Sequence, residues 1–342
     1  MTHQGDIRVE EVSGCLLCDA RGEQLYAGLR DRLFGADGVW NICQCPGCRL
    51  MWLNPRPLLG ELGKIYATYF SHQGEVRRSK LGWFLEKAKL GLYAAVPGYR
   101  GLADGDGWRR LGRMLYLFPS LRKAARWGTM HLNGVRKGKL LDVGCGNGHF
   151  LFRMRGAGWE VLGVENDRVA VQQAADQYGI RVIPLTLQEA ALPEASVDAV
   201  TLSHVIEHVH DPVGLLSECR RVLRPGGHVV VVTPNVECWG HRLFRDSWRG
   251  LEPPRHLYLF SRRTLQACAQ KAGLVIDFIQ SSARRAWWMW AASHSIKNKG
   301  KFSDEDMTWE WRIGGLVFQV LEELAHYVSE NVGEELLLVA SR

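Results

Sequence analysis

The sequence of 342 residues contains no long apolar run. A membrane-spanning helix needs about 18 or more consecutive apolar residues, and the longest suspicious stretch, Ala286 to Ala292, has seven. The first residues, Met1 to Ser13, are polar and include acids, so they do not resemble a signal peptide. These absences predict a cytoplasmic protein, and the length predicts about two domains with a substantial core.

Acidic residues are scarce between Val76 and Lys137. This segment has 14 Lys or Arg against three acids, a net charge of +11 in a chain whose total is +7. Such local basicity suits an anionic substrate, a membrane surface or nucleic acid, or it is the solvated face of amphipathic helices. Because no recognised nucleic-acid module accompanies it, we expect no stable nucleic-acid partner, and peripheral contact with a membrane or a lipid-linked substrate remains a candidate.

Nine cysteines without a secretory signal do not predict a disulfide framework. Four of them form two CxxC pairs, Cys15 with Cys18 and Cys45 with Cys48, separated by 26 residues of hairpin-like sequence. Four thiolates suit a structural zinc ion and leave no open position for catalysis. We therefore predict a zinc-ribbon-like module over residues 10–55; two redox motifs or a chance pattern are the alternatives.

The remainder of the chain divides into a helical segment and an alternating α/β segment. Residues 56–136 have helical spacing and are predicted as a linker or lid. From Gly138 onward strands and helices alternate, which predicts a mostly parallel sheet with helices on both faces. The expected strands are 140–143, 160–164, 181–184, 199–203, 228–233 and 275–279, and the expected helices are 149–156, 168–178 and 212–223. Ligands of such sheets bind beyond the carboxyl ends of the strands.

A glycine turn follows the first strand of this segment. The dinucleotide fingerprint is GxGxxG with an acid some 20 residues later. Here Gly144, Gly146 and Gly148 form GxGxG, Asp142 precedes them, and Glu165 ends the second strand. An acid beneath the turn would repel a pyrophosphate, whereas S-adenosylmethionine carries a sulfonium and an ammonium and no phosphate. Electrostatics therefore favours this methyl donor over NAD.

Several motifs add a family resemblance. Residues 141–148 resemble motif I of class I S-adenosylmethionine-dependent methyltransferases, and residues 192–200, 218–228 and 333–340 resemble later motifs of that family. The N-terminal module, followed by Asn54-Pro55-Arg56-Pro57, is similar to the zinc-binding start of one bacterial branch. The resemblance implies a Rossmann-like seven-stranded α/β domain over residues 137–342, with a substrate insertion around 281–330.

The same resemblance implies the residues that bind the donor. The backbone of Gly144, Cys145 and Gly146 would line the methionine moiety above Asp142, and Gly148 would complete the loop. Glu165 would hold the ribose, Asn166 would flank the adenine, and Leu187 would face its ring. Ser203, with His204, would lie near the transferred methyl group.

The acceptor side is predicted from His204-Val205-Ile206-Glu207-His208. The pattern HxxEH is an inverted zinc-protease signature, but that motif needs both histidines on one helix, and here a strand ends at His204. The segment resembles the ExxEH metal cluster of ubiquinone-pathway O-methyltransferases and small-RNA ribose 2′-O-methyltransferases. His204 replaces the first acid, Glu207 and His208 match, and His256 is a candidate fourth ligand. The alternatives are that these histidines only hydrogen-bond substrate or backbone, or that one is a general base.

Together these features predict methyl transfer to a small-molecule hydroxyl of a sugar, a glycan precursor or a phenolic or quinone-type intermediate. His204, Glu207 and His208 are the candidate catalytic residues. The cofactors would be S-adenosylmethionine, a structural zinc ion and a candidate second divalent ion. An NAD-dependent sugar-modifying enzyme and a non-catalytic S-adenosylmethionine-binding module are the alternatives.

Overall fold

A computed structural model describes residues 2–66, 80–132, 136–303, 307–326 and 328–342. The chain forms two compact units. The first contains Met1–Tyr69, His204–Leu216 and Val231–Leu338, and the second contains Phe70–Ser203, Ser217–Val230 and Val339–Arg342.

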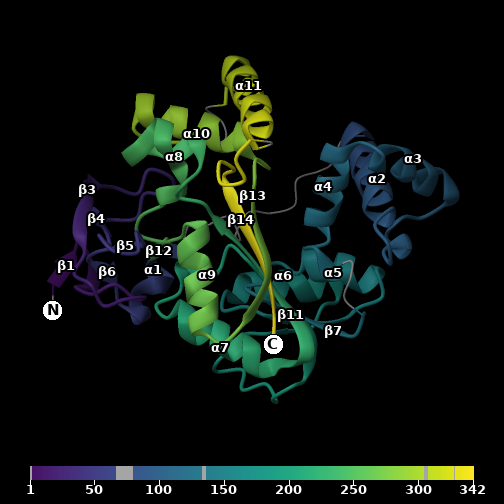
Figure 1. Ribbon diagram of the computed structural model, residues 1–342, viewed down its shortest axis with the longest axis horizontal. Helices are drawn as coiled ribbons and strands as arrows, with labels where there is room; N and C mark the ends of the chain where they lie inside the picture. The colour runs from purple at the N-terminus through teal and green to yellow at the C-terminus, as the bar shows by residue number, and fades with distance from the viewer. Residues whose placement is uncertain (1, 67–79, 133–135, 304–306, 327) are drawn as a thin grey trace. The chain divides into compact units, whose positions relative to one another are not determined.

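A seven-stranded sheet is the main β-structure, with strand order β13-β14-β11-β10-β7-β8-β9. Figure 1 shows β13 and β14 of this sheet side by side. Its strands are β7 (Lys139–Val143), β8 (Glu160–Val164), β9 (Val182–Ile183), β10 (Val197–Ser203), β11 (Leu223–Pro234), β13 (Val275–Ser282) and β14 (Glu335–Ser341). Numbered within the sheet, the order is 3-2-1-4-5-7-6, so the last strand lies between the fifth and sixth strands of the usual doubly wound order. The predicted Rossmann-like α/β fold is confirmed.

Strands β10, β7, β8 and β9 of the second unit pair in parallel. They read as near-continuous apolar runs because parallel strands are covered on both faces, and Leu140, Leu141 and Val200 are fully buried. The helices after β7 and β8 are α5 (His149–Gly156) and α6 (Arg168–Tyr178). The Asp167 carboxylate caps α6 by accepting the Val169 N–H, and Gly179 ends the helix in a left-handed conformation.

Three further helices belong to the second unit: α2 (Lys80–Ala94), α3 (Asp106–Tyr116) and α4 (Pro119–Gly128). Pro119 starts α4 at its first position, where its fixed φ suits a helix and its missing N–H is not needed. Helices α2 and α3 meet at Gly91 and Gly112, where a Cβ on Gly112 would lie 1.8 Å from the Gly91 carbonyl oxygen. No larger residue fits this contact.

The first unit begins with two small sheets. Strands β1 (Thr2–Gln4), β2 (Ile7–Glu10) and β6 (Arg56–Pro57) form one of them, and β3 (Glu23–Leu29), β4 (Trp40–Gln44), β5 (Met51–Leu53) and β12 (Tyr258–Leu259) form the other. The hairpin material between the CxxC pairs thus forms antiparallel strands. Strand β12 comes from some 200 residues later in the chain and pairs Tyr258 with Trp52, which the sequence did not predict.

The helices α1 (Leu62–Tyr66), α8 (Trp239–Phe244), α9 (Arg262–Lys271), α10 (Ala286–Lys299) and α11 (Trp309–His326) belong to the first unit. Helix α7 (Pro212–Val222) follows a 3₁₀ turn, η5 (Ile206–His208). Among the described residues, further 3₁₀ turns are η1 (Leu59–Glu61), η3 (Arg100–Leu102), η6 (Arg245–Ser247) and η7 (Arg249–Leu251). Helices α10 and α11 occupy the predicted insertion and pack together, with Gly315 against the Trp287 carbonyl. Within the described ranges, no helix is both long enough and apolar enough to cross a bilayer.

Candidate donor and acceptor sites

The glycine turn between β7 and α5 has a backbone that favours glycine. Gly144, Gly146 and Gly148 have φ of 67°, 53° and 74°, in the left-handed region that other residues rarely adopt. A Cβ on Gly148 would also lie 2.9 Å from the Cβ of Ala174, whereas the corresponding position at Gly146 is open. The loop is therefore closed on the side of α6 and accessible at Gly146.

Glu165, at the end of β8, holds this loop in place. Its Oε2 accepts the Gly146 N–H at 2.9 Å, and its Oε1 accepts the Asp167 N–H at 2.9 Å. The half-buried carboxylate is thus oriented by two backbone donors and keeps further lone pairs for a ligand. Asn166, beside it, is exposed. A carboxylate of this kind fits the two hydroxyls of a ribose.

Asp142 lies buried at the end of β7. Its Oδ1 accepts a hydrogen bond of 2.6 Å from the Thr201 hydroxyl. Burial raises the pKa of Asp142 to about 7, and the nearby Glu165 charge acts in the same direction. A cation placed beside this group would lower its pKa again, so the electrostatics fits a sulfonium or ammonium better than a phosphate.

The other predicted donor residues lie around this loop or at the ends of later strands. Burial raises the pKa of the Cys145 thiol well above its usual range, so this cysteine contributes backbone and packing and no thiolate. Leu187 is buried, and Ser203 ends β10 with an exposed side chain. All nine predicted donor-binding residues belong to the second unit.

Glu207, His208 and His256 come together in the first unit. One potential ligand atom from each lies within 4.8 Å of the others. Glu207 and His208 belong to η5, which follows β10, and the Leu257 N–H donates to the Glu207 carbonyl at 2.7 Å. This backbone bond joins the two segments that carry the cluster.

His256 presents one free ring nitrogen to the cluster. Its Nδ1 lies 2.7 Å from the Gly250 carbonyl, which can only accept, so Nδ1 carries the proton. Burial lowers the pKa of His256 to about 4, so the ring is neutral at pH 7. Its Nε2 lies 3.6 Å from Glu252 Oε2, too far for a hydrogen bond. A lone pair on Nε2 is therefore available to a metal ion or a proton.

His208 also has its Nδ1 atom against a backbone carbonyl. Its Nδ1 lies 3.0 Å from the Arg255 carbonyl and 2.8 Å from the Tyr66 hydroxyl. The rings of His208 and His256 are 4.7 Å apart between centroids. Metal-binding histidines commonly donate their second ring N–H to a backbone carbonyl, which fixes the ring and its tautomer. Both histidines of the cluster have this support.

Glu207 supplies the carboxylate of the cluster. It is fully buried, accepts the Thr233 hydroxyl at 2.9 Å and lies 3.2 Å from His204 Nδ1. Burial alone would raise the pKa of Glu207, but the hydrogen bond from His204 and the neighbouring histidines lower it to about 2. The group is therefore a carboxylate at pH 7.

His204 differs from the other predicted ligands. Its two ring nitrogens lie 3.2 Å from Glu207 Oε1 and 3.2 Å from Glu335 Oε1. Burial acts to lower the pKa of His204, but hydrogen bonds to the two carboxylates outweigh it and raise the pKa to about 9. A protonated imidazole has no lone pair for a metal ion or a substrate proton. The cluster thus offers three candidate ligands, and His204 lies at hydrogen-bond distance from one of them, Glu207.

Glu335, at the start of β14, was not predicted from the sequence. Its Oε2 also lies 3.4 Å from Arg284 Nε. The sequence feature that could have indicated it is the pair Glu334-Glu335, which stands directly before an apolar run. Ionised groups are rarely buried without a partner, so acids beside a buried strand suggest a buried polar contact.

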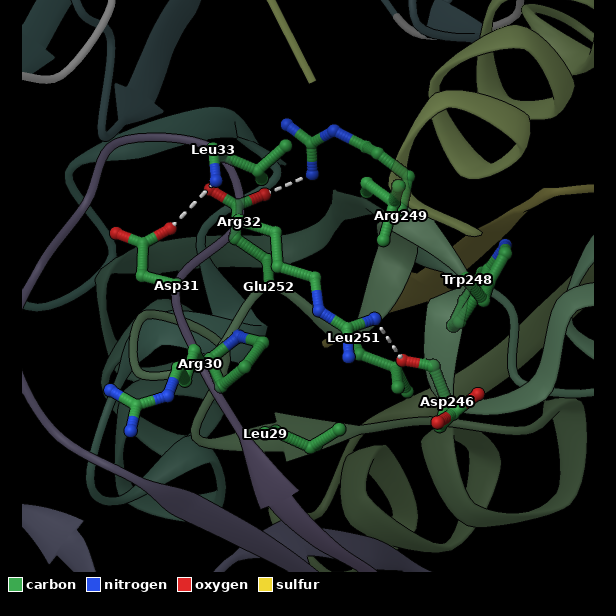
Figure 2. A pocket seen from close by; sticks show the side chains of 12 residues that line it. Leu29, Arg30, Asp31, Arg32, Leu33, Asp246, Trp248, Arg249, Leu251 and Glu252 are labelled. Atoms are coloured by element: carbon green, nitrogen blue, oxygen red, sulfur yellow. Dashed lines mark hydrogen bonds and ion pairs between the residues drawn. The ribbon is translucent and has the colours of Figure 1, made fainter. Parts of the chain in front are cut away.

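A buried ion network supports the segment that carries His256. Arg255 donates to both oxygens of Asp31 at 2.8 and 2.9 Å and to Glu252 at 2.9 Å, and the Arg255 and Asp31 side chains are inaccessible to solvent. Figure 2 shows Arg249 paired with the same Glu252 carboxylate. Charge-assisted bidentate pairs of this kind fix geometry. They tie the segment to the loop after β3, 224 residues earlier.

The four predicted zinc ligands also lie together. The sulfur atoms of Cys15, Cys18, Cys45 and Cys48 are within 4.8 Å of one another, and two pairs are 3.4 Å apart. Tetrahedral zinc with Zn–S bonds of about 2.3 Å needs sulfurs about 3.8 Å apart. The backbone N–H groups of Leu17 and Cys48 point at sulfur. The donor set therefore fits a structural zinc ion, and Cys43 lies outside it.

Comparisons with known proteins agree with this arrangement. Residues 116–277 match the methyltransferase domain family. The chain is 37% identical over 110 residues to a ubiquinone biosynthesis O-methyltransferase of Alkalilimnicola ehrlichii, covering 30% of this chain and 44% of that protein. It is 38% identical over 114 residues to a tRNA U34 carboxymethyltransferase of Citrifermentans bemidjiense, covering 31% and 35%. The chain thus spans less than half the length of these relatives.

Among solved structures, a geranyl diphosphate methyltransferase in complex with S-adenosylmethionine has a TM-score of 0.45 and 18% identity, covering 65% of this chain and 86% of that one. The strand order and the glycine loop agree with this family match: residues 116–277, a little less than half of the chain, resemble a methyltransferase domain. The four cysteines and the strands β1 to β6 precede the matched region.

Proposed function

We propose that this protein transfers the methyl group of S-adenosylmethionine to a hydroxyl group of a small molecule. The observation that carries the acceptor assignment is the Glu207–His208–His256 cluster, whose first two members follow Ser203 closely in the chain. The two relatives named above act on different acceptors, so the donor assignment rests on the family and the acceptor assignment on this cluster.

The chemistry of a hydroxyl acceptor explains the residue types. S-adenosylmethionine supplies an already electrophilic methyl group, so the protein must position the hydroxyl and remove its proton. Two imidazoles and one carboxylate are a ligand set that leaves coordination positions open. A divalent ion held there would lower the pKa of a bound hydroxyl. Imidazole ligands favour zinc or iron over magnesium.

Each residue then has a defined role. His208 and His256 offer Nε2, since their Nδ1 atoms face backbone carbonyls. Glu207 supplies an ionised oxygen, and the protonated His204 holds that carboxylate in place. Without a metal ion, the neutral His256 would still be able to accept the acceptor's proton, so the metal and the general-base mechanisms are separable by experiment.

The test combines metal analysis with transfer of labelled methyl groups to a panel of phenols, sugar nucleotides and polyprenylated phenols. We expect the purified protein to bind one ion beyond that of the cysteine site, and His256→Ala to lose that ion and nearly all transfer. His210→Ala is a matched control, because His210 bonds the Pro57 carbonyl outside the cluster. Full transfer after chelation would exclude the metal mechanism and leave the general base.

Calorimetry separates the competing functions. Binding of S-adenosylmethionine without binding of NAD would exclude a dinucleotide enzyme, and the opposite result would overturn the proposal. Donor binding with no transfer to any acceptor in the panel would favour a non-catalytic binding module.

A further inference from the structure

An exposed apolar and basic surface lies where α3 ends and α4 begins. We name it the α3–α4 corner; it consists of Arg110, Arg113, Met114, Leu117, Phe118 and Arg122. Met114, Leu117 and Phe118 are 66%, 77% and 59% exposed. Exposed apolar side chains are informative when, as here, several large ones are grouped on one surface. The three arginines are exposed as well.

The local helix geometry places these side chains together. Residues 110, 113, 114 and 117 are three or four positions apart, so they share one face of α3 and its end. Phe118 immediately precedes α4, and the Arg122 N–H donates to the Phe118 carbonyl at 2.9 Å, which puts Arg122 one turn further on. The opposite side of α3 buries Gly112 against α2. The corner is therefore the outward surface of this helical group.

The charge of the corner is not neutralised by the acids of the same helices. Residues 80–132 include ten Lys or Arg and three acids. Those acids pair elsewhere: Glu86 with Lys89, Asp104 with Lys87, and Asp106 with Arg109. The arginines of the corner thus retain a local positive field around the apolar side chains.

We propose that the α3–α4 corner docks on an anionic phospholipid bilayer. Helical surfaces that bind such an interface combine apolar side chains, which enter the acyl boundary, with basic side chains, which meet the lipid phosphates. A surface for nucleic acid would carry several stacking aromatics within its basic groove, whereas the corner has one aromatic, Phe118, beside the aliphatic Met114 and Leu117. This docking does not depend on the proposed methyl transfer.

Vesicle sedimentation with the full chain tests the proposal. Vesicles of phosphatidylcholine mixed with phosphatidylglycerol should bind the protein, and pure phosphatidylcholine should bind it far less. The triple variant R110Q/R113Q/R122Q should bind the anionic vesicles on the order of a hundredfold more weakly at low salt, since each basic residue near the surface contributes about fivefold. The variant M114S/L117S/F118S should lose on the order of tenfold.

Matched controls alter exposed residues elsewhere. The variant R168Q/R181Q/K297Q removes the same charge, and L316S/V320S removes exposed apolar side chains of α11. Circular dichroism should show every variant folded, because all the altered side chains are exposed. Equal losses in the control and corner variants would overturn the proposal. So would binding to single-stranded RNA that depends on the corner arginines while the vesicles bind nothing.

Discussion

At the scale of single residues, Glu165 determines both the shape of the glycine loop and its fit to a ribose. Its two oxygens bond Gly146 and Asp167. We expect Glu165→Ala to weaken binding of S-adenosylmethionine on the order of tenfold to a hundredfold, because hydrogen bonds to a charged group are worth about 1.5–3 kcal/mol. Calorimetry measures the change. Glu160→Ala, an exposed acid on the same strand, should bind the donor normally.

Asp142 makes a prediction about pH. Its pKa is about 7 in the folded protein, against 3.8 for an unperturbed aspartate such as that of the unfolded chain. Between these values the folded protein keeps a proton that the unfolded chain releases, so stability falls as pH rises from about 4 to about 7. The slope from this group is at most about 1.4 kcal/mol per pH unit.

Asp142→Asn removes this titration while its amide oxygen can still accept the Thr201 hydroxyl. The free energy of unfolding of the variant minus that of the wild type should therefore increase with pH across this range and level off above it. Urea titrations of the donor-free protein at several pH values measure the difference. A difference that is constant with pH would show that Asp142 is ionised throughout.

At the scale of elements, the cysteine cluster should hold β3, β4 and β5 in place through a metal ion. We expect one zinc per chain to be lost in Cys45→Ala, since three thiolates bind zinc less well than four and small modules fold with their metal. Elemental analysis and limited proteolysis of residues 10–55 provide the readout. Cys43→Ala should keep its zinc, because Cys43 lies on β4, two residues before Cys45, and outside the cluster. Zinc retained in Cys45→Ala would contradict the assignment.

The elements of the α/β segment were largely predictable from the sequence. Strand β8 and helices α5 and α6 have the predicted bounds, because a short apolar run, a glycine turn and a capped amphipathic helix are all local signals. Strand β11 begins at Leu223, five residues before the prediction, because pairing continues through Pro225-Gly226-Gly227, which reads locally as a turn.

The partners of the acceptor cluster were not predictable. Tyr66 on His208, Glu335 on His204 and Asp31 on Arg255 are separated from these residues by 142, 131 and 224 positions. Sequence spacing reports contacts within a helix or hairpin and carries no information on such distant pairs. The motif therefore predicted His204 as a ligand in place of the first acid, while its environment of two carboxylates depends on tertiary contacts.

At the scale of the whole molecule, the donor residues and the acceptor cluster belong to different units. Asp142, the glycine loop and Glu165 lie in the second unit, and Glu207, His208 and His256 lie in the first. Each set is held by contacts within its own unit, namely the Glu165–Gly146 bond and the Arg255–Asp31 and His256–Gly250 bonds. A substitution that disrupts the donor residues should therefore leave the acceptor cluster intact, and the reverse should also hold.

We predict that His256→Ala binds S-adenosylmethionine within about twofold of the wild-type affinity while methyl transfer falls on the order of a hundredfold or more, as expected when a residue that acts on the proton transfer is removed. Glu165→Ala should show the reverse pattern, with weak donor binding and an unchanged content of the second metal ion. Calorimetry and metal analysis on the two variants, side by side, provide the readout. If His256→Ala weakens donor binding as strongly as Glu165→Ala does, the two sets are coupled, and the histidines belong to the structure of the donor site.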